Sequence, residues 1–157
     1  MRYSTALAVA VLMIGLTLAF DASAKSEGIV AKPSAFSVKV TIDRLAAVFK
    51  KKGIRVFARI NHAAAAKSID KKLRPSELLI FGTPKIGTPL MQESIISGID
   101  LPLKALAYQD AKGQVYLVYN HPGYLARRHE IKSKKKLISS ISRILSNLTD
   151  LAIKDNY

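Results

Sequence analysis

The chain has 157 residues, with 25 Lys and Arg against 11 Asp and Glu, and hence a net charge of +14 at pH 7. This length fits one domain with its own hydrophobic core. The absence of cysteine excludes disulfides, thiol catalysis and cysteine metal sites. The positive charge favours an anionic partner over a cationic one.

The first segment of the chain has the pattern of a secretory signal peptide. Arg2 precedes an apolar run over residues 6–20, and Ala22-Ser23-Ala24 follows as a small-residue cleavage site. The run is shorter than the roughly 20 residues that a membrane-spanning helix needs. We therefore expect cleavage after Ala24, with an uncleaved anchor as the alternative. The exported protein, periplasmic or secreted, would comprise residues 25–157 without a transmembrane span.

Apolar periodicity predicts the elements of the first half of this domain. A short extended piece at residues 28–31 precedes a helix that Ser37 caps and Gly53 ends. Residues 54–60 alternate as a strand with one polar-leaning face. Residues 63–69 are an Ala-rich helix by propensity, and a buried-type strand follows at residues 77–81.

The second half of the domain is predicted to form a hairpin and a long helix. Residues 103–108 and 114–119 predict a hairpin whose loop has Gly113 at a position that favours positive φ. A long helix over residues 133–153 has one apolar stripe, which we expect to cover its own sheet. The pattern predicts an α+β domain, an antiparallel sheet backed by helices on one face. Dimerisation through sheet edges stays open, so the protein is a monomer or a homodimer.

Two Gly-Thr-Pro turns lie within residues 77–91. The stretch GTPKIGT is close to a phosphate-binding loop, but it lacks the Lys before the Thr, and Pro84 and Pro89 remove two backbone amides. Thr88 as N-cap, with Pro89 at the first helical position, predicts a short helix from Pro89. Its N-terminus, with Lys85 nearby, suits a small anion. A strand-to-helix corner without a ligand is the alternative.

His62 is the first candidate for chemistry because it follows a predicted strand. It suits a general base that Glu77 or Asp100 orients, or a metal or haem ligand, although a His that caps the short helix is the simpler interpretation. His121 and His129 lack metal-ligand spacing, so we assign no metal site. Asp100 and Lys104 either form an ion pair or line a pocket. The ligand-binding candidates are His62, Thr83, Lys85, Thr88 and Lys104.

Basic residues gather before and at the start of the last predicted helix. They are Arg127, Arg128, Lys132, Lys134, Lys135 and Lys136. A charge run is most often a solvated surface, and the partner that this one fits is an anionic envelope surface, whereas nucleic acid is disfavoured for an exported domain. Lysines at a helix start oppose the macrodipole, so either the helix starts later or the charge serves an interface.

Several motifs, in this order, resemble the bacterial domain of unknown function 302 family. They lie at residues 58–63, 74–85, 87–91, 100–104 and 119–120, and the resemblance runs from about Gly28 to His129. It implies a compact α+β domain with a curved sheet, similar in class to TATA-binding-protein-like domains, and no established activity. This chain has His121 where family members tend to have Asp, so no catalytic carboxylate is expected there.

Three function classes follow. The sequence favours an exported binding or accessory protein of the cell envelope, with its ligand site between the Gly-Thr-Pro corner and His62. A small enzyme that uses His62 with Glu77 or Asp100 is the second class, and an envelope module that acts through the basic C-terminal helix is the third. The sequence does not identify a cofactor.

Overall fold

The computed structural model describes residues 28–155, so the predicted signal peptide lies outside the described residues. Its centre is one five-stranded sheet in the order β1-β5-β4-β3-β2, in which every neighbouring pair is antiparallel. The strands are β1 (Ile29–Ser34), β2 (Arg55–Asn61), β3 (Ser76–Gly82), β4 (Leu103–Gln109) and β5 (Val115–Asn120). Strands β2 to β5 coincide with predicted strands, whereas β1 runs three residues beyond the short extended piece expected at residues 28–31. The expected α+β class is confirmed.

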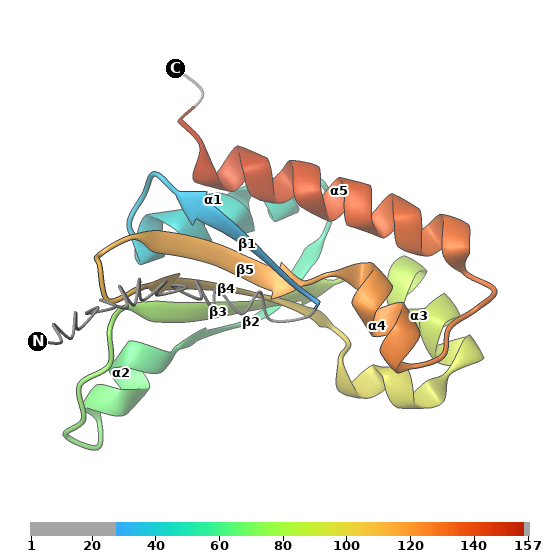
Figure 1. Cartoon of the computed structure of the whole chain (residues 1–157), viewed down its shortest axis with the longest axis horizontal. Coiled ribbons are helices and arrows are strands. Elements are labelled where there is room, and N and C mark those ends of the chain that lie inside the picture. The colour runs from blue at the N-terminus through green and yellow to red at the C-terminus, as the bar shows by residue number, and fades with distance from the viewer. Residues whose placement is uncertain (1–27, 156–157) are drawn as a thin grey trace, which may run out of the picture.

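The helices lie in three places around this sheet. They are α1 (Val38–Lys51), α2 (His62–Lys67), α3 (Pro84–Glu93), the 3₁₀ helix η1 (Ile95–Ile99), α4 (Pro122–Arg128) and α5 (Lys135–Ile153). Figure 1 shows α1 and α5 on the same face of the sheet, α3 and α4 together at one end, and α2 at the other end. Periodicity predicts neither η1 nor α4 because each is too short to show a pattern.

The predicted boundaries of α1 are confirmed by its caps. The Ser37 side chain accepts a hydrogen bond from the Val40 amide, as an N-cap residue does. At the other end Gly53 has φ +68°, and its amide donates to the Lys50 carbonyl. The buried face of α1 then meets the sheet, where the Phe49 ring lies 4.2 Å from the Phe81 ring between centroids.

Helix α5 covers its own sheet, as expected. It begins two residues later than predicted, and its buried residues are Ile141, Leu145, Leu148, Thr149, Ala152 and Ile153. Lys32 in β1 ties the strand to this helix, because its Nζ donates to Thr149 Oγ1 at 2.9 Å and to Asp150 Oδ1 at 2.9 Å. The β4–β5 hairpin has Gly113 at φ +87°, in agreement with its expected role.

The start of α3 corrects one prediction. Both Gly-Thr-Pro turns carry the same helix-start signal, and the helix begins at the first of them: Thr83 occupies the N-cap position and Pro84 lies in the first turn. Thr88 and Pro89 are therefore inside the helix rather than at its start. Proline in a helix interior removes a hydrogen bond, and the residue after it, Leu90, is buried.

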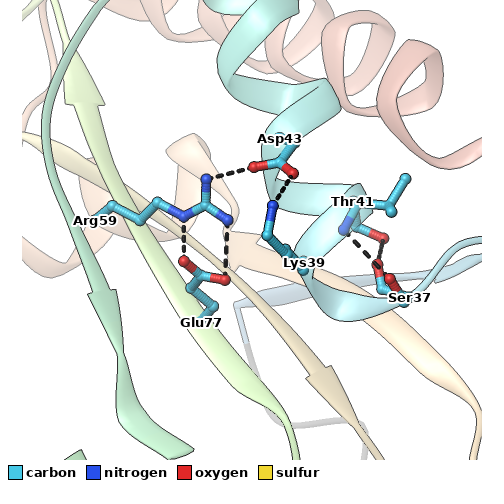
Figure 2. Close-up of polar contacts among 7 residues, drawn as sticks. Ser37, Lys39, Thr41, Asp43, Arg59 and Glu77 are labelled. Atoms are coloured by element: carbon cyan, nitrogen blue, oxygen red, sulfur yellow. Dashed lines mark hydrogen bonds and ion pairs between the residues drawn. The ribbon is translucent and has the colours of Figure 1, made fainter. Parts of the chain in front are cut away.

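A polar network ties β2, β3 and α1 (Figure 2). Glu77 is only 6% exposed, and the Arg59 guanidinium donates to both of its carboxylate oxygens, with the Nη2 contact at 3.1 Å. The same guanidinium donates to Asp43 in α1 at 2.5 Å, and Lys39 Nζ donates to Asp43 at 2.8 Å. These hydrogen bonds from Lys39 and then Arg59 lower the pKa of Asp43, while the bond with Glu77 raises the pKa of Arg59.

Replacing Arg59 by methionine should lower the free energy of unfolding by about 3 kcal/mol, because the substitution leaves a buried carboxylate without its counter-charge. Glu77→Gln should lower the free energy of unfolding less, since the Arg59 side chain is 34% exposed and keeps its ion pair with Asp43. The double variant Arg59→Met/Glu77→Leu should recover most of the loss. Urea denaturation at pH 7 measures all three, and an Arg59→Met variant as stable as the wild type would contradict this account.

Candidate functional site

An apolar pocket of about 280 Å³ lies where β3 runs into α3. Five parts of the chain form its walls: the end of α1, the start of β2, the β3–α3 corner, the start of β4 and the middle of α5. Phe49 and Phe81 contribute from α1 and β3, whereas Met91 and Leu145 contribute from α3 and α5. The pocket therefore extends the hydrophobic core toward solvent at one end of the sheet.

Two half-exposed apolar side chains mark the mouth of this pocket. Phe57 lies at a register shift of β2 between Val56 and Ala58, and 46% of its surface is exposed. Ile144, on α5, is 43% exposed. Both line the pocket, so a ligand that enters it would cover apolar surface that otherwise faces water.

Gly87 keeps the pocket open on the α3 side. It lies inside the helix and lines the pocket, and a Cβ added there would meet only the Leu101 Cδ1 atom, at 3.9 Å. Glycine weakens a helix interior relative to alanine. Because no steric contact requires glycine here, its absence of a side chain leaves space for a ligand.

The structure brings together only part of the predicted ligand site. Thr83 and Thr88 both line the pocket, and of its lining residues they alone carry polar side chains. Lys85 is exposed on the first turn of α3, outside the lining. Lys104 lies on β4 between residues that face away from it, so it points to the sheet face opposite α1 and α5.

His62 lies far from this corner, which corrects the expected grouping. In β2, Arg55 pairs with Gly82 next to the corner, whereas Asn61, just before His62, pairs with Glu77 at the opposite end. The six intervening steps span roughly 20 Å at about 3.3 Å per residue. His62 is exposed, and the cap of α2 is Asn61, whose side chain accepts from the Ala64 amide at 2.8 Å.

The two acids proposed to orient His62 have other partners. Glu77 binds Arg59, as described above, and Asp100 lies 2.6 Å from His129 Nε2 and 3.4 Å from Arg128 Nε. The acid–base set of His62 with Glu77 or Asp100 is therefore not assembled in this structure. Among residues 28–155, no group of three or more His, Cys, Asp or Glu could hold a metal ion.

The Asp100–His129 pair was missed by sequence reasoning. Its members are 29 residues apart and share no local pattern. His129 is buried, and its Nδ1 atom and the Ser97 hydroxyl have no hydrogen-bond partner in the described structure. Both residues line a cavity of about 20 Å³, which is the size for a single water molecule. This closed cavity is too small for a substrate.

The first turn of α3 offers little to an anion. Pro84 has no amide hydrogen, and the Ile86 and Gly87 amides donate to the Thr83 carbonyl at 3.1 and 3.0 Å. Of the first four helical positions only the Lys85 amide remains for a ligand. A small anion held by the helix N-terminus alone is therefore disfavoured.

The basic segment 127–136 packs against the end of α3. The Glu93 carboxylate accepts hydrogen bonds from the amides of Lys132 and Ser133, at 2.6 and 2.8 Å. The hydroxyl of Ser133 donates to the same carboxylate at 2.5 Å. These contacts, first of all that with the Ser133 hydroxyl, lower the pKa of Glu93.

Comparisons with known proteins concern the family and the fold of the chain. The family model for Domain of unknown function DUF302 matches residues 30–148. The crystal structure of an uncharacterized conserved DUF302 protein from Bacillus stearothermophilus has a TM-score of 0.72 and 19% identity, and the match covers 81% of this chain and 99% of that one. At this identity the likeness establishes the fold.

Two similar proteins are named as channels. Fluoride-specific ion channel FluC 1 of Brucella suis biovar 1 (strain 1330) is 46% identical over 110 residues, which are 70% of this chain and 43% of that protein. Fluoride-specific ion channel FluC 2 of Brucella melitensis biotype 1 has the same identity, with 41% of its length covered. This chain thus spans less than half of these relatives. In residues 28–155, no helix is long and apolar enough to cross a membrane.

Gly87→Ala should raise the free energy of unfolding by about 0.5 to 1 kcal/mol, because the added methyl group stabilises the helix and meets no close atom. Gly98→Ala is the matched control, since a Cβ there would lie 3.0 Å from the Met91 Cε atom and would gain less. Thermal and urea denaturation measure both variants. A destabilised Gly87→Ala variant would show that the space beside Gly87 is not open.

Proposed function

The chain belongs to the domain of unknown function 302 family, and we propose that this member is a binding protein whose pocket between α3, α5 and the sheet holds the apolar part of a small amphipathic molecule. The observation that carries the proposal is the composition of the pocket. Its lining is apolar except for Thr83 and Thr88, and its volume of about 280 Å³ lies near the lower end of ligand pockets.

The pocket selects for an alkyl chain or a ring rather than for a charged molecule. Each Å² of apolar surface removed from water contributes about 25 cal/mol to binding before the costs of association. The walls from Phe49, Phe57 and Met91 supply such surface. A fully charged ligand would lose its hydration there without compensating hydrogen bonds.

The polar end of the ligand belongs at the Gly-Thr-Pro corner. Thr83 and Thr88 provide two hydroxyl groups in the lining, and Lys85 provides an exposed positive charge on the same helix. This arrangement supports a ligand with a carboxylate or phosphate head group outside an apolar body. The predicted anionic ligand is thus retained, but with its apolar part as the main source of binding energy.

A place in the cell envelope is part of the proposal. The N-terminal pattern predicts export, and two proteins that are 46% identical to this chain over 110 residues are named as ion channels. We do not extend their ion selectivity to this chain, because its apolar pocket does not suit a hydrated ion. A binding role is favoured over an enzyme because, among residues 28–155, the lining of the pocket includes no side chain that could act as an acid or a base.

Binding of a fluorescent fatty-acid analogue, cis-parinaric acid, tests the proposal. The wild-type protein should bind the probe, and Gly87→Leu should weaken binding at least about tenfold, equal to about 1.4 kcal/mol, because the new side chain fills the pocket. Ala65→Leu, a similar change on exposed α2, should leave binding unchanged.

Circular dichroism and the thermal midpoint confirm that each variant is folded. Equal probe binding by wild type and Gly87→Leu would place the probe elsewhere and contradict the proposed site. Absence of probe binding by folded wild-type protein would contradict the ligand class.

A further inference from the structure

The helix η1 presents three isoleucines to solvent. Ile95, Ile96 and Ile99 are 72%, 67% and 74% exposed. Single exposed apolar residues are normal on a protein surface, but these three lie within five consecutive residues. A 3₁₀ helix has three residues per turn, so Ile96 and Ile99 project from the same side. The result is a small, protruding apolar patch.

The basic segment 127–136 is fixed beside this patch at both ends of η1. Before η1, the Glu93 carboxylate holds the backbone amides of Lys132 and Ser133. After η1, Asp100 holds His129 and Arg128. The Lys132 side chain is 81% exposed, and its Nζ atom lies 3.8 Å from the Glu130 carboxylate, which is exposed as well. The apolar patch and the positive charge are therefore neighbours on one surface.

Within the protein, Glu93 and Asp100 offset only part of the positive charge of this segment. Between residues 127 and 136 six basic residues accompany a single acidic one, Glu130. Helix α5 starts at Lys135 with Lys134 at its N-cap, and its first turn contains no acidic residue and no side-chain cap. Positive charges at a helix N-terminus oppose the macrodipole. An anionic surface outside the protein would offset this repulsion.

We infer that η1 and the basic segment form a membrane-docking surface for an anionic bilayer. The isoleucines enter the boundary between head groups and acyl chains, and the exposed side chains of Lys132, Lys135 and Lys136 contact lipid phosphates. A second copy of this chain fits the surface poorly. Three isoleucines fall short of the roughly 800 Å² per partner of a stable interface, and two copies would place like charges face to face.

The docking surface lies next to the pocket along α3. Thr88 and Met91 line the pocket, and the same helix ends at Glu93, two residues before the first isoleucine of η1. Docking would therefore bring the pocket close to the source of an amphipathic ligand. The inference stands apart from the proposed function, since vesicle binding does not require the pocket to be filled. Gly87→Leu should bind vesicles as the wild type does.

A tryptophan placed in η1 tests the inference directly, because the chain contains no tryptophan. Ile96→Trp should show a blue-shifted emission, and quenching by brominated lipid, on vesicles of phosphatidylglycerol with phosphatidylcholine. The matched control is Ile69→Trp, since Ile69 is 68% exposed and follows α2 at the other end of the molecule. Its emission should not change.

Sedimentation with vesicles measures the contribution of each part. Replacing Ile95, Ile96 and Ile99 together by serine should lower the partition coefficient about tenfold or more, as should Lys132→Glu with Lys135→Glu. All five side chains are exposed, so these variants should remain folded. The control Ile69→Ser should bind like the wild type.

Three results would overturn the inference. The first is an unchanged emission of Ile96→Trp on anionic vesicles. The second is equal binding to vesicles of phosphatidylcholine alone, which would remove the role of the basic segment. The third is a blue shift that depends on protein concentration without vesicles, because it would identify a second copy as the occupant.

Discussion

The packing of α5 across the sheet is the constraint on which the rest of the structure depends. At about 1.5 Å per residue its 19 residues span roughly 28 Å, more than the sheet needs for cover. The C-terminal half packs on α1 and β1, where Lys32 and the buried Leu148 and Ala152 hold it. The N-terminal half extends past the sheet, and α3 and α4 pack against it there.

The extension of α5 past the sheet explains why the pocket and the basic surface lie at the same end of the sheet. Ile141 and Ile144 on the extended half of α5 face the β3–α3 corner and form one wall of the pocket. The N-terminus of the same helix places its lysines beyond α4, where Glu93 and Asp100 anchor the approaching chain. One helix thus positions both an apolar cavity and a cationic surface, a combination that suits a protein for amphipathic molecules at a membrane.

Sequence reasoning located the strands of the central hairpin and the two long helices because their signals are local. The 3.6-residue stripes of the two long helices, the cap at Ser37 and the glycines at 53 and 113 each act within a few residues. Local signals cannot predict where a helix begins when two nearby segments carry the same helix-start signal. The two Gly-Thr-Pro turns differ only in tertiary context, and the choice between them depends on where β3 ends and on what buries Leu90.

The candidate site was only partly predictable for a related reason. The corner with Thr83 and Thr88 was identified from turn chemistry, and it does line the pocket. The apolar walls come from segments distant in sequence, so no pattern links Phe57 to Ile144. Likewise the partner of Asp100 is His129 rather than His62, because strand register decides which ends of the sheet meet.

The central claim is that the pocket binds an amphipathic small molecule. Native mass spectrometry of protein purified from the cells that express it tests this claim most directly, with wild type and Gly87→Leu compared under the same gentle conditions. The account predicts an additional mass of a small amphipathic compound on the wild-type protein that is absent from the variant. Bare and identical masses for the two proteins would contradict it.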